Sequence, residues 1–172
     1  MKIKPMLLCG LFAALMAICA WIYIPFGAVG LTMQTFAVAL SLCLLGGKWG
    51  TVSILVYLLL GTVGVPVFSG FRGGIGVLLG ASGGYLFGFL AFGLAYWLLT
   101  ALLRKKRWAR MAGLVAGLLL CYGVGTAWYM GVYAPGTAFA PVLLHSVVPY
   151  LVPDVLKLMV AAPLAERLRR FL

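Results

Sequence analysis

Apolar runs, each near the length needed to cross a lipid bilayer, fill almost the whole chain and limit its possible folds more than any other feature. Short segments rich in glycine, proline or basic residues separate six such runs, 6–24, 31–45, 49–65, 84–103, 111–130 and 147–164. A spanning helix takes about 20 residues. Only 9% of the 172 residues are charged, against roughly 25% in a typical soluble domain. The pattern predicts an all-α integral membrane protein with six transmembrane helices.

Six spans leave no room for a separate soluble domain, so residues 1–172 are expected to form a single transmembrane domain. Lys2 and Lys4 precede the first apolar run, as in a signal peptide. That run reaches about 20 residues and further spans follow it, which favours a retained first helix. The four cysteines lie inside apolar runs without a CxxC pattern, and we interpret them as packing residues.

The basic residues predict the orientation of the chain. Six helices with both termini on one side place eleven basic residues on that side: Lys2, Lys4, Lys48, Arg104, Lys105, Lys106, Arg107, Arg110, Arg167, Arg169 and Arg170. Arg72 alone falls in a loop on the other side, and Lys157 falls within the last run. Cytoplasmic flanks carry an excess of Lys and Arg, so both termini are expected to be cytoplasmic. The net charge of +11 then reflects topology and contact with anionic lipid, and no binding to nucleic acid is expected.

Only two residues of the chain are acidic, and one of them lies inside an apolar run. Glu166 lies among arginines at the cytoplasmic end, where a surface ion pair explains it. Asp154 lies in the last run, three residues before Lys157, so both side chains share one helix face. The pair either satisfies itself and fixes the helix to its neighbours, or forms the polar end of a ligand site. Pro149 and Pro153 favour a ligand site, since they are expected to interrupt the helix and widen a cavity there.

A glycine-rich segment, 69–84, lies on the outer side of the predicted topology and permits two interpretations. Gly76, Gly80, Gly84 and Gly88 recur every four residues, a spacing typical of close helix packing. Alternatively, the segment forms a flexible outer lid whose backbone approaches a ligand. In that case Arg72 is placed to bind a carboxylate. The segment matches no nucleotide-binding motif, so this chain is not expected to hydrolyse ATP.

The first apolar run has small residues at helical spacing. Gly10 and Ala14 are four residues apart, as are Ala13 and Ala17. Small residues at this spacing give a smooth helix face that packs closely on another helix. The neighbouring helix belongs either to the same chain or to a partner protein.

Several segments together, in their order along the chain, resemble one known family. These are Ile24-Pro25-Phe26, Leu31-Thr32-Met33-Gln34-Thr35, Gly64-Val65-Pro66-Val67-Phe68, the run from Gly73 to Gly80, Ser82-Gly83-Gly84-Tyr85-Leu86 and Pro153-Asp154-Val155-Leu156-Lys157. The set resembles the BioY family, the biotin-specific substrate-binding (S) components of energy-coupling factor (ECF) transporters. The resemblance covers nearly the whole chain. An Ala81-Ser82 step where Pro-Thr would be expected is a minor departure.

The resemblance implies an S-component fold that captures biotin at an outward-facing site in the bacterial cytoplasmic membrane. It also implies that the first helix, through Gly10, Ala13, Ala14 and Ala17, contacts a transmembrane coupling protein driven by two ATPase subunits. Asp154 and Lys157 match the acidic and basic residues of the family's last helix. Gln34, Gly74 and Tyr85 lie in matching segments and are included among the expected substrate-binding residues.

The chemistry of biotin agrees with these residues. Its ureido ring carries N–H donors and a carbonyl oxygen, which suit a buried carboxylate and an adjacent ammonium group such as Asp154 and Lys157. Its apolar body suits a cavity lined by Phe, Tyr and Leu side chains. Its carboxylate requires a cation, and both Arg72 and Lys157 remain candidates.

Three other functions are weighed against this one. The first is an S component for a different vitamin, which direct ligand binding would distinguish. The second is a small channel or scaffold, but a channel predicts a polar stripe along several helices that the sequence lacks. The third is a membrane enzyme, which we do not expect because the only histidine, His145, lies far from any Cys. No metal or cofactor is expected, and biotin enters only as the transported ligand.

Overall fold

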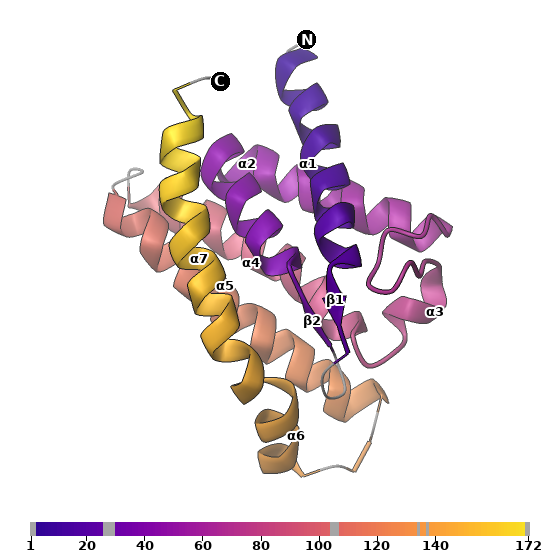
Figure 1. The fold of residues 1–172 in the computed structure, drawn as a ribbon. Helices are drawn as coiled ribbons and strands as arrows, with labels where there is room; N and C mark the ends of the chain where they lie inside the picture. Colours follow the sequence, from indigo (N-terminus) through magenta and orange to yellow (C-terminus); the bar gives the residue numbers. More distant parts are fainter. Residues whose placement is uncertain (1–2, 26–29, 104–106, 134, 137, 171–172) are drawn as a thin grey trace.

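The computed structural model describes residues 3–25, 30–103, 107–133, 135–136 and 138–170. The helices are α1 (Ile3–Trp21), α2 (Gln34–Val63), α3 (Ile75–Leu78), α4 (Gly83–Leu102), α5 (Arg107–Trp128), α6 (Phe139–Ser146) and α7 (Val148–Leu168), with a π-helical turn, Tyr129–Tyr133, extending α5 (Figure 1). Two short antiparallel strands, β1 (Tyr23–Ile24) and β2 (Leu31–Thr32), join α1 to α2. The hairpin is a small departure from the all-α expectation.

The expected count of six spanning helices is not confirmed. Among the described residues, five helices are long and apolar enough to cross a membrane. The count differs because the expected second and third spans, 31–45 and 49–65, both fall within the 30-residue helix α2. Gly46 breaks that helix with φ 80° and ψ 168°, a conformation that glycine adopts without steric cost. The chain changes direction there, so α2 consists of two straight segments (Figure 1).

Close packing of α4 on α5 forms one side of the molecule, and glycines make it possible. A Cβ atom built on Gly88 would lie 2.8 Å from the carbonyl oxygen of Cys121, and one on Gly117 would overlap the Phe92 ring. By contrast, nothing lies within 4 Å of a Cβ on Gly76. The packing interpretation therefore holds for Gly84 and Gly88, whereas the interpretation of the segment around Gly76 as a flexible lid stays a prediction.

The basic residues gather at one end of the bundle. The described ends of α1 and α7 lie at the same end of the molecule (Figure 1). There Glu166 on α7 forms ion pairs with Arg107 and Arg110 at the start of α5, at 3.6 and 3.3 Å. Arg169 donates to the carbonyl oxygen of Cys43, just before the break in α2, at 2.6 Å. Lys2 and the 104–106 part of the basic cluster lie outside the described residues.

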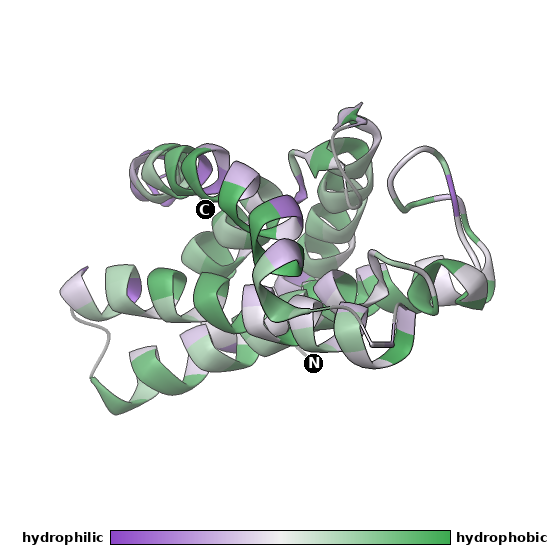
Figure 2. Cartoon of the chain, turned by 90° about the horizontal axis from the view of Figure 1, so that it is seen from below, coloured by the Kyte–Doolittle hydropathy of each residue, from purple (hydrophilic) through white to green (hydrophobic). Residues whose placement is uncertain are grey.

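Large apolar side chains cover the long helices on the outside as well as the inside. Apolar residues predominate along them, while hydrophilic residues concentrate near their ends (Figure 2). Leu11, Leu98, Leu119 and Val160 are examples of exposed apolar side chains on four different helices. Such a surface suits hydrocarbon rather than water.

Candidate functional site

A cavity lies away from the basic end, between the β1–β2 hairpin, the loop before α3 and the helices α4, α5 and α7. Its empty space is about 680 Å³ including the open mouth. The lining residues are Gly30, Leu31, Thr32, Gln34, Thr35, Phe68, Ser69, Arg72, Val77, Ser82, Tyr85, Leu86, Phe89, Leu118, Cys121, Tyr122, Ser146, Tyr150, Asp154 and Lys157. Five of the six predicted substrate-binding residues are among them, which places segments from the whole chain around one space.

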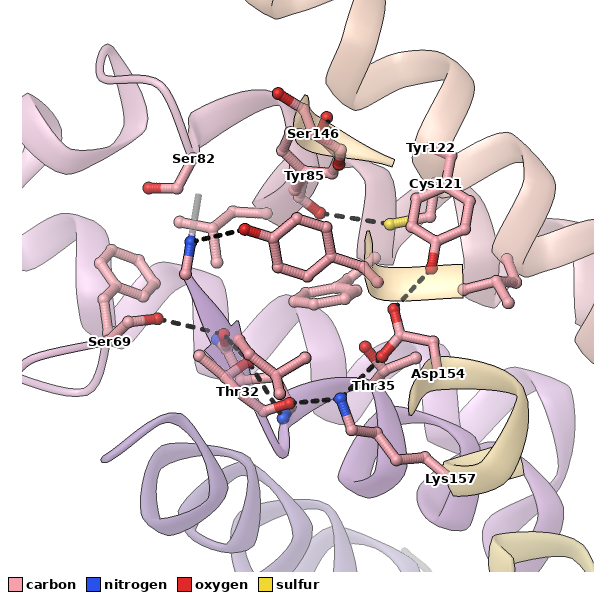
Figure 3. Close-up of a pocket in the computed structure, with 18 of the residues that line it drawn as sticks. Thr32, Thr35, Ser69, Ser82, Tyr85, Cys121, Tyr122, Ser146, Asp154 and Lys157 are labelled. Carbon is pink, nitrogen blue, oxygen red and sulfur yellow. Dashed lines mark hydrogen bonds and ion pairs between the residues drawn. The ribbon is translucent and has the colours of Figure 1, made fainter. Parts of the chain in front are cut away.

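A buried ionic cluster forms one end of the cavity. Lys157 Nζ lies 2.7 Å from Asp154 Oδ1, and the hydroxyl of Tyr122 donates to Asp154 Oδ2 at 2.7 Å (Figure 3). Lys157 also donates to the carbonyl oxygen of Thr32 at 2.6 Å. Asp154 and Lys157 are only 6% and 8% exposed, and the spacing of three residues on α7 brings them together as the sequence predicts. These contacts balance the charge and hold the carboxylate as an acceptor.

The predicted interruption of the last helix is wrong. Pro149 lies in the first turn of α7 and Pro153 lies within it, and the helix continues from Val148 to Leu168. Proline is tolerated in a first turn, where the missing N–H has no helical partner. Asp154 is therefore presented by a continuous helix.

A chain of hydrogen bonds connects β2, α2 and the loop before α3. Thr32 Oγ1 and Ser69 Oγ both donate to Gln34 Oε1, at 2.9 and 3.2 Å, and Gln34 Nε2 donates to the hydroxyl of Tyr57 at 2.6 Å. That hydroxyl donates to the carbonyl oxygen of Val67 at 3.1 Å. Gln34 is 4% exposed, so its amide both lines the cavity and fixes the loop.

Aromatic and aliphatic side chains form the remaining walls. Tyr85 on α4 donates to the carbonyl oxygen of Ser146 at 3.2 Å, and the N–H of Gly30 donates to the hydroxyl of Tyr150 at 3.2 Å. Their rings, together with Phe89 and Leu118, present apolar surface to the cavity. The apolar walls suit a small ligand with an apolar body, while the ionic cluster and the Gln34 amide supply polar contacts.

Arg72 and Gly74, both predicted as substrate-binding residues, occupy different positions. Arg72 is exposed at the cavity mouth, where its Nε donates to the carbonyl oxygen of Ser69 at 3.0 Å. Ser69 lies across the cavity from Asp154 (Figure 3). Gly74 does not line the cavity, because its N–H donates to the carbonyl oxygen of Gly61 at 2.7 Å and so fixes the loop to α2.

The four small residues predicted to dock a partner divide into two pairs. Gly10 and Ala14 are exposed on α1, and nothing lies within 4 Å of a Cβ built on Gly10. Ala13 and Ala17 are 2% and 5% exposed within the chain's own core. The first pair provides a smooth exposed face, whereas the second allows close packing inside the chain.

Tyr122 lines the cavity beside Asp154 and was not among the residues predicted from the sequence. It lies in the middle of α5, and its hydroxyl binds Asp154 on another helix. A buried tyrosine hydroxyl needs a partner, so a tyrosine in a mid-membrane position was a usable signal. The sequence alone does not indicate that its partner is Asp154.

The model of one family, BioY, matches residues 1–172. The chain belongs to the BioY family. The resemblance inferred from the sequence is thereby confirmed.

Relatives in the BioY family cover nearly the same length. The chain is 41% identical to a biotin transporter BioY of Thermotoga maritima, over 94% of this chain and 93% of that one. It is 40% identical to a probable biotin transporter BioY of Pyrococcus horikoshii, over 98% of both chains. These relatives are named as transporters, which agrees with the expectation that the chain is not an enzyme.

The fold also matches a solved structure, the crystal structure of the S-component for biotin from an ECF-type ABC transporter. The TM-score is 0.86, with 24% identity, covering 98% of this chain and 92% of that one. The S-component fold predicted from the resemblance is confirmed. Membership of this family, together with helices long and apolar enough to cross a membrane, identifies a multi-pass membrane protein.

Proposed function

We propose that this chain is the substrate-capture subunit of a biotin importer and binds biotin in the cavity bounded by Asp154 and Lys157. The observation that carries the proposal is the buried ionic cluster, which lines one end of a cavity whose walls also include the rings of Tyr85 and Phe89. An ion pair that only fixes a helix to its neighbours does not need to line a cavity, whereas a pair that binds a ligand must do so. The names of the relatives, biotin transporters, support the choice of ligand.

The ureido ring is assigned to the ionic end. A carboxylate has about four acceptor positions, and Lys157 and Tyr122 occupy one on each oxygen of Asp154. Asp154 therefore retains capacity to accept from a ureido N–H. Two of the three N–H donors of Lys157 bind Asp154 and Thr32, which leaves the third for the ureido carbonyl oxygen.

The carboxylate of biotin is assigned to Arg72. Lys157 is already charge-balanced by Asp154 at 2.7 Å, whereas Arg72 lies at the mouth and its contact with Ser69 uses only Nε. Guanidinium N–H groups bind carboxylates in pairs. Biotin would then extend from the buried cluster toward the mouth, with its apolar body against Tyr85 and Phe89.

The mouth is assigned to the outer side of the bacterial cytoplasmic membrane. Apart from Arg72 and Lys157, the described basic residues gather at the opposite end, for which the positive-inside rule favours the cytoplasm. Delivery of biotin would require a transmembrane coupling protein and two ATPase subunits, as in ECF transporters. The face formed by Gly10 and Ala14 is assigned to that coupling protein, with Ala13 and Ala17 letting α1 pack closely behind it.

Isothermal titration of the purified full chain with biotin, biotin methyl ester and thiamine tests the assignment. We expect binding of biotin, weaker binding of the ester because Arg72 loses a charged partner, and no binding of thiamine. Binding of thiamine without binding of biotin would instead identify an S component for another vitamin. Failure of all three ligands with folded protein would contradict the capture of biotin.

Substitutions in the cluster test the site within the same titration. Asp154→Asn keeps the shape but loses a charge-assisted hydrogen bond, worth roughly 1.5–3 kcal/mol, or about ten- to a hundredfold in affinity. Lys157→Met should have a similar effect, and the double variant should lose less than the sum because the residues interact. Lys48→Met, at an exposed position at the basic end, serves as control. Wild-type affinity in folded Asp154→Asn protein would show that the pair only fixes α7.

A further inference from the structure

A second hollow of the molecule lies on its lipid-facing side, between α5 and α7. Its empty space is about 750 Å³ including the open face, and it is lined by Met111, Leu114, Val115, Leu118, Leu119, Tyr122, Leu151, Val155, Leu158 and Met159. These residues define the α5–α7 groove. The only polar group among their side chains is the hydroxyl of Tyr122, which is turned inward onto Asp154 at 2.7 Å. The groove therefore presents hydrocarbon alone.

The α5–α7 groove is continuous with a basic pocket at the end that gathers the positive charges. Met111 and Leu114 line both the groove and a smaller hollow that contains Arg107, Arg110 and Glu166. Arg167, Arg169 and Arg170 are exposed nearby at the end of α7. Glu166 pairs with Arg107 and Arg110, and because three more arginines lie at this end, the local charge stays positive.

The length of the groove corresponds to one leaflet of a bilayer. It extends along α5 from Met111 to Tyr122, and at 1.5 Å per residue this distance is about 16 Å. The hydrocarbon core of a bilayer is about 30 Å thick. An acyl chain lying in the groove would therefore end near the membrane midplane, with its headgroup beside Arg107 and Arg110.

We propose that the α5–α7 groove and its basic pocket form a binding site for one anionic phospholipid of the cytoplasmic leaflet. The acyl chain lies between α5 and α7, and the phosphate accepts from Arg110 and Arg107. Each arginine has five N–H donors, and the ion pairs with Glu166 involve one terminal nitrogen of each, so donors remain for a phosphate. Leu118 and Tyr122 line both the groove and the ligand cavity and so form a wall between them. The bound acyl chain would cover the lipid-facing side of this wall.

Native mass spectrometry of the detergent-purified chain tests the site with phosphatidylglycerol and phosphatidylcholine of identical acyl chains. We expect one phosphatidylglycerol to remain bound where phosphatidylcholine is lost. Arg110→Gln should lower retention about tenfold, the loss of one charge-assisted hydrogen bond. Val155→Trp, which fills the groove, should do the same. Glu166→Gln should raise retention, because it releases both arginines from a competing carboxylate.

Two matched variants separate a defined site from general attraction to the membrane. Lys48→Gln removes a basic residue at the same end, and Leu98→Trp enlarges an exposed apolar residue on α4; neither lines the groove, and neither should change retention. Equal retention of the two lipids, or equal losses in Lys48→Gln and Arg110→Gln, would overturn the proposal. If Val155→Trp strongly lowers the thermal unfolding temperature, Val115→Trp on the facing helix replaces it. In either case the proposal is decided by the comparison of the two lipids and by the comparison of Arg110→Gln with Lys48→Gln.

Discussion

Asp154 and Lys157 are costly to keep inside a membrane, and their contacts explain how the chain tolerates them. Each ionised side chain at the bilayer centre costs about 2.5–3.5 kcal/mol by insertion scales. Here the ammonium group of Lys157 and the carboxylate of Asp154 form an ion pair at 2.7 Å. Asp154 also accepts a hydrogen bond from the hydroxyl of Tyr122, and Lys157 donates one to the carbonyl oxygen of Thr32. Four groups from α5, α7 and β2 therefore act as one unit, and changing any of them changes the rest.

Tyr122→Phe tests this dependence at a single atom. The change removes the donor to Asp154 Oδ2 and keeps the ring. A hydrogen bond to a charged group contributes roughly 1.5–3 kcal/mol, part of which is lost from folding, so we expect biotin affinity to fall about tenfold in titration. The control is Tyr133→Phe, at an exposed position in the π-helical turn that extends α5, and it should leave affinity unchanged. Equal biotin affinity in both variants would mean that the hydrogen bond from Tyr122 to Asp154 does not contribute to binding.

At the scale of elements, the long helices and the break at Gly46 could be predicted from the sequence, whereas contacts between helices could not. The apolar runs located α1, α4, α5 and α7, because each is near the length of a bilayer. In α2 they predicted a break at 46–48, and the structure breaks the helix at Gly46, although both segments belong to one bent element of 30 residues. The Asp154–Lys157 pair followed from helical spacing within one element. Tyr122 was missed because its partner lies 32 residues away on another helix.

Glycine at position 88 is required by the packing of α4 on α5. A Cβ there would lie 2.8 Å from a backbone oxygen that cannot move without shifting α5. Overpacking of this kind costs typically about 1–3 kcal/mol, so Gly88→Ala should lower the thermal unfolding temperature in detergent. Gly123→Ala is the matched control on α5, since nothing lies within 4 Å of its Cβ. A Gly88→Ala protein as stable as the Gly123→Ala protein would mean that the helices separate easily.

At the scale of the whole molecule, charge and cavity lie at opposite ends. The ion pairs of Glu166 with Arg107 and Arg110 and the bond from Arg169 to Cys43 join α5, α7 and α2 at the basic end. The cavity with Arg72 at its mouth lies at the other end. One end therefore carries the charge that suits an anionic membrane surface, while the other holds the cavity.

This arrangement predicts the sidedness of single cysteines in intact cells. In a chain with Cys9, Cys19, Cys43 and Cys121 replaced by alanine, a cysteine at exposed Pro135 should react with an impermeant thiol reagent. A cysteine at exposed Arg167 should react only after the membrane is permeabilised, since positively charged flanks remain in the cytoplasm. Titration with biotin confirms that each variant is folded. Faster labelling at position 167 than at 135 in intact cells would reverse the topology, and with it the outward-facing assignment of the cavity.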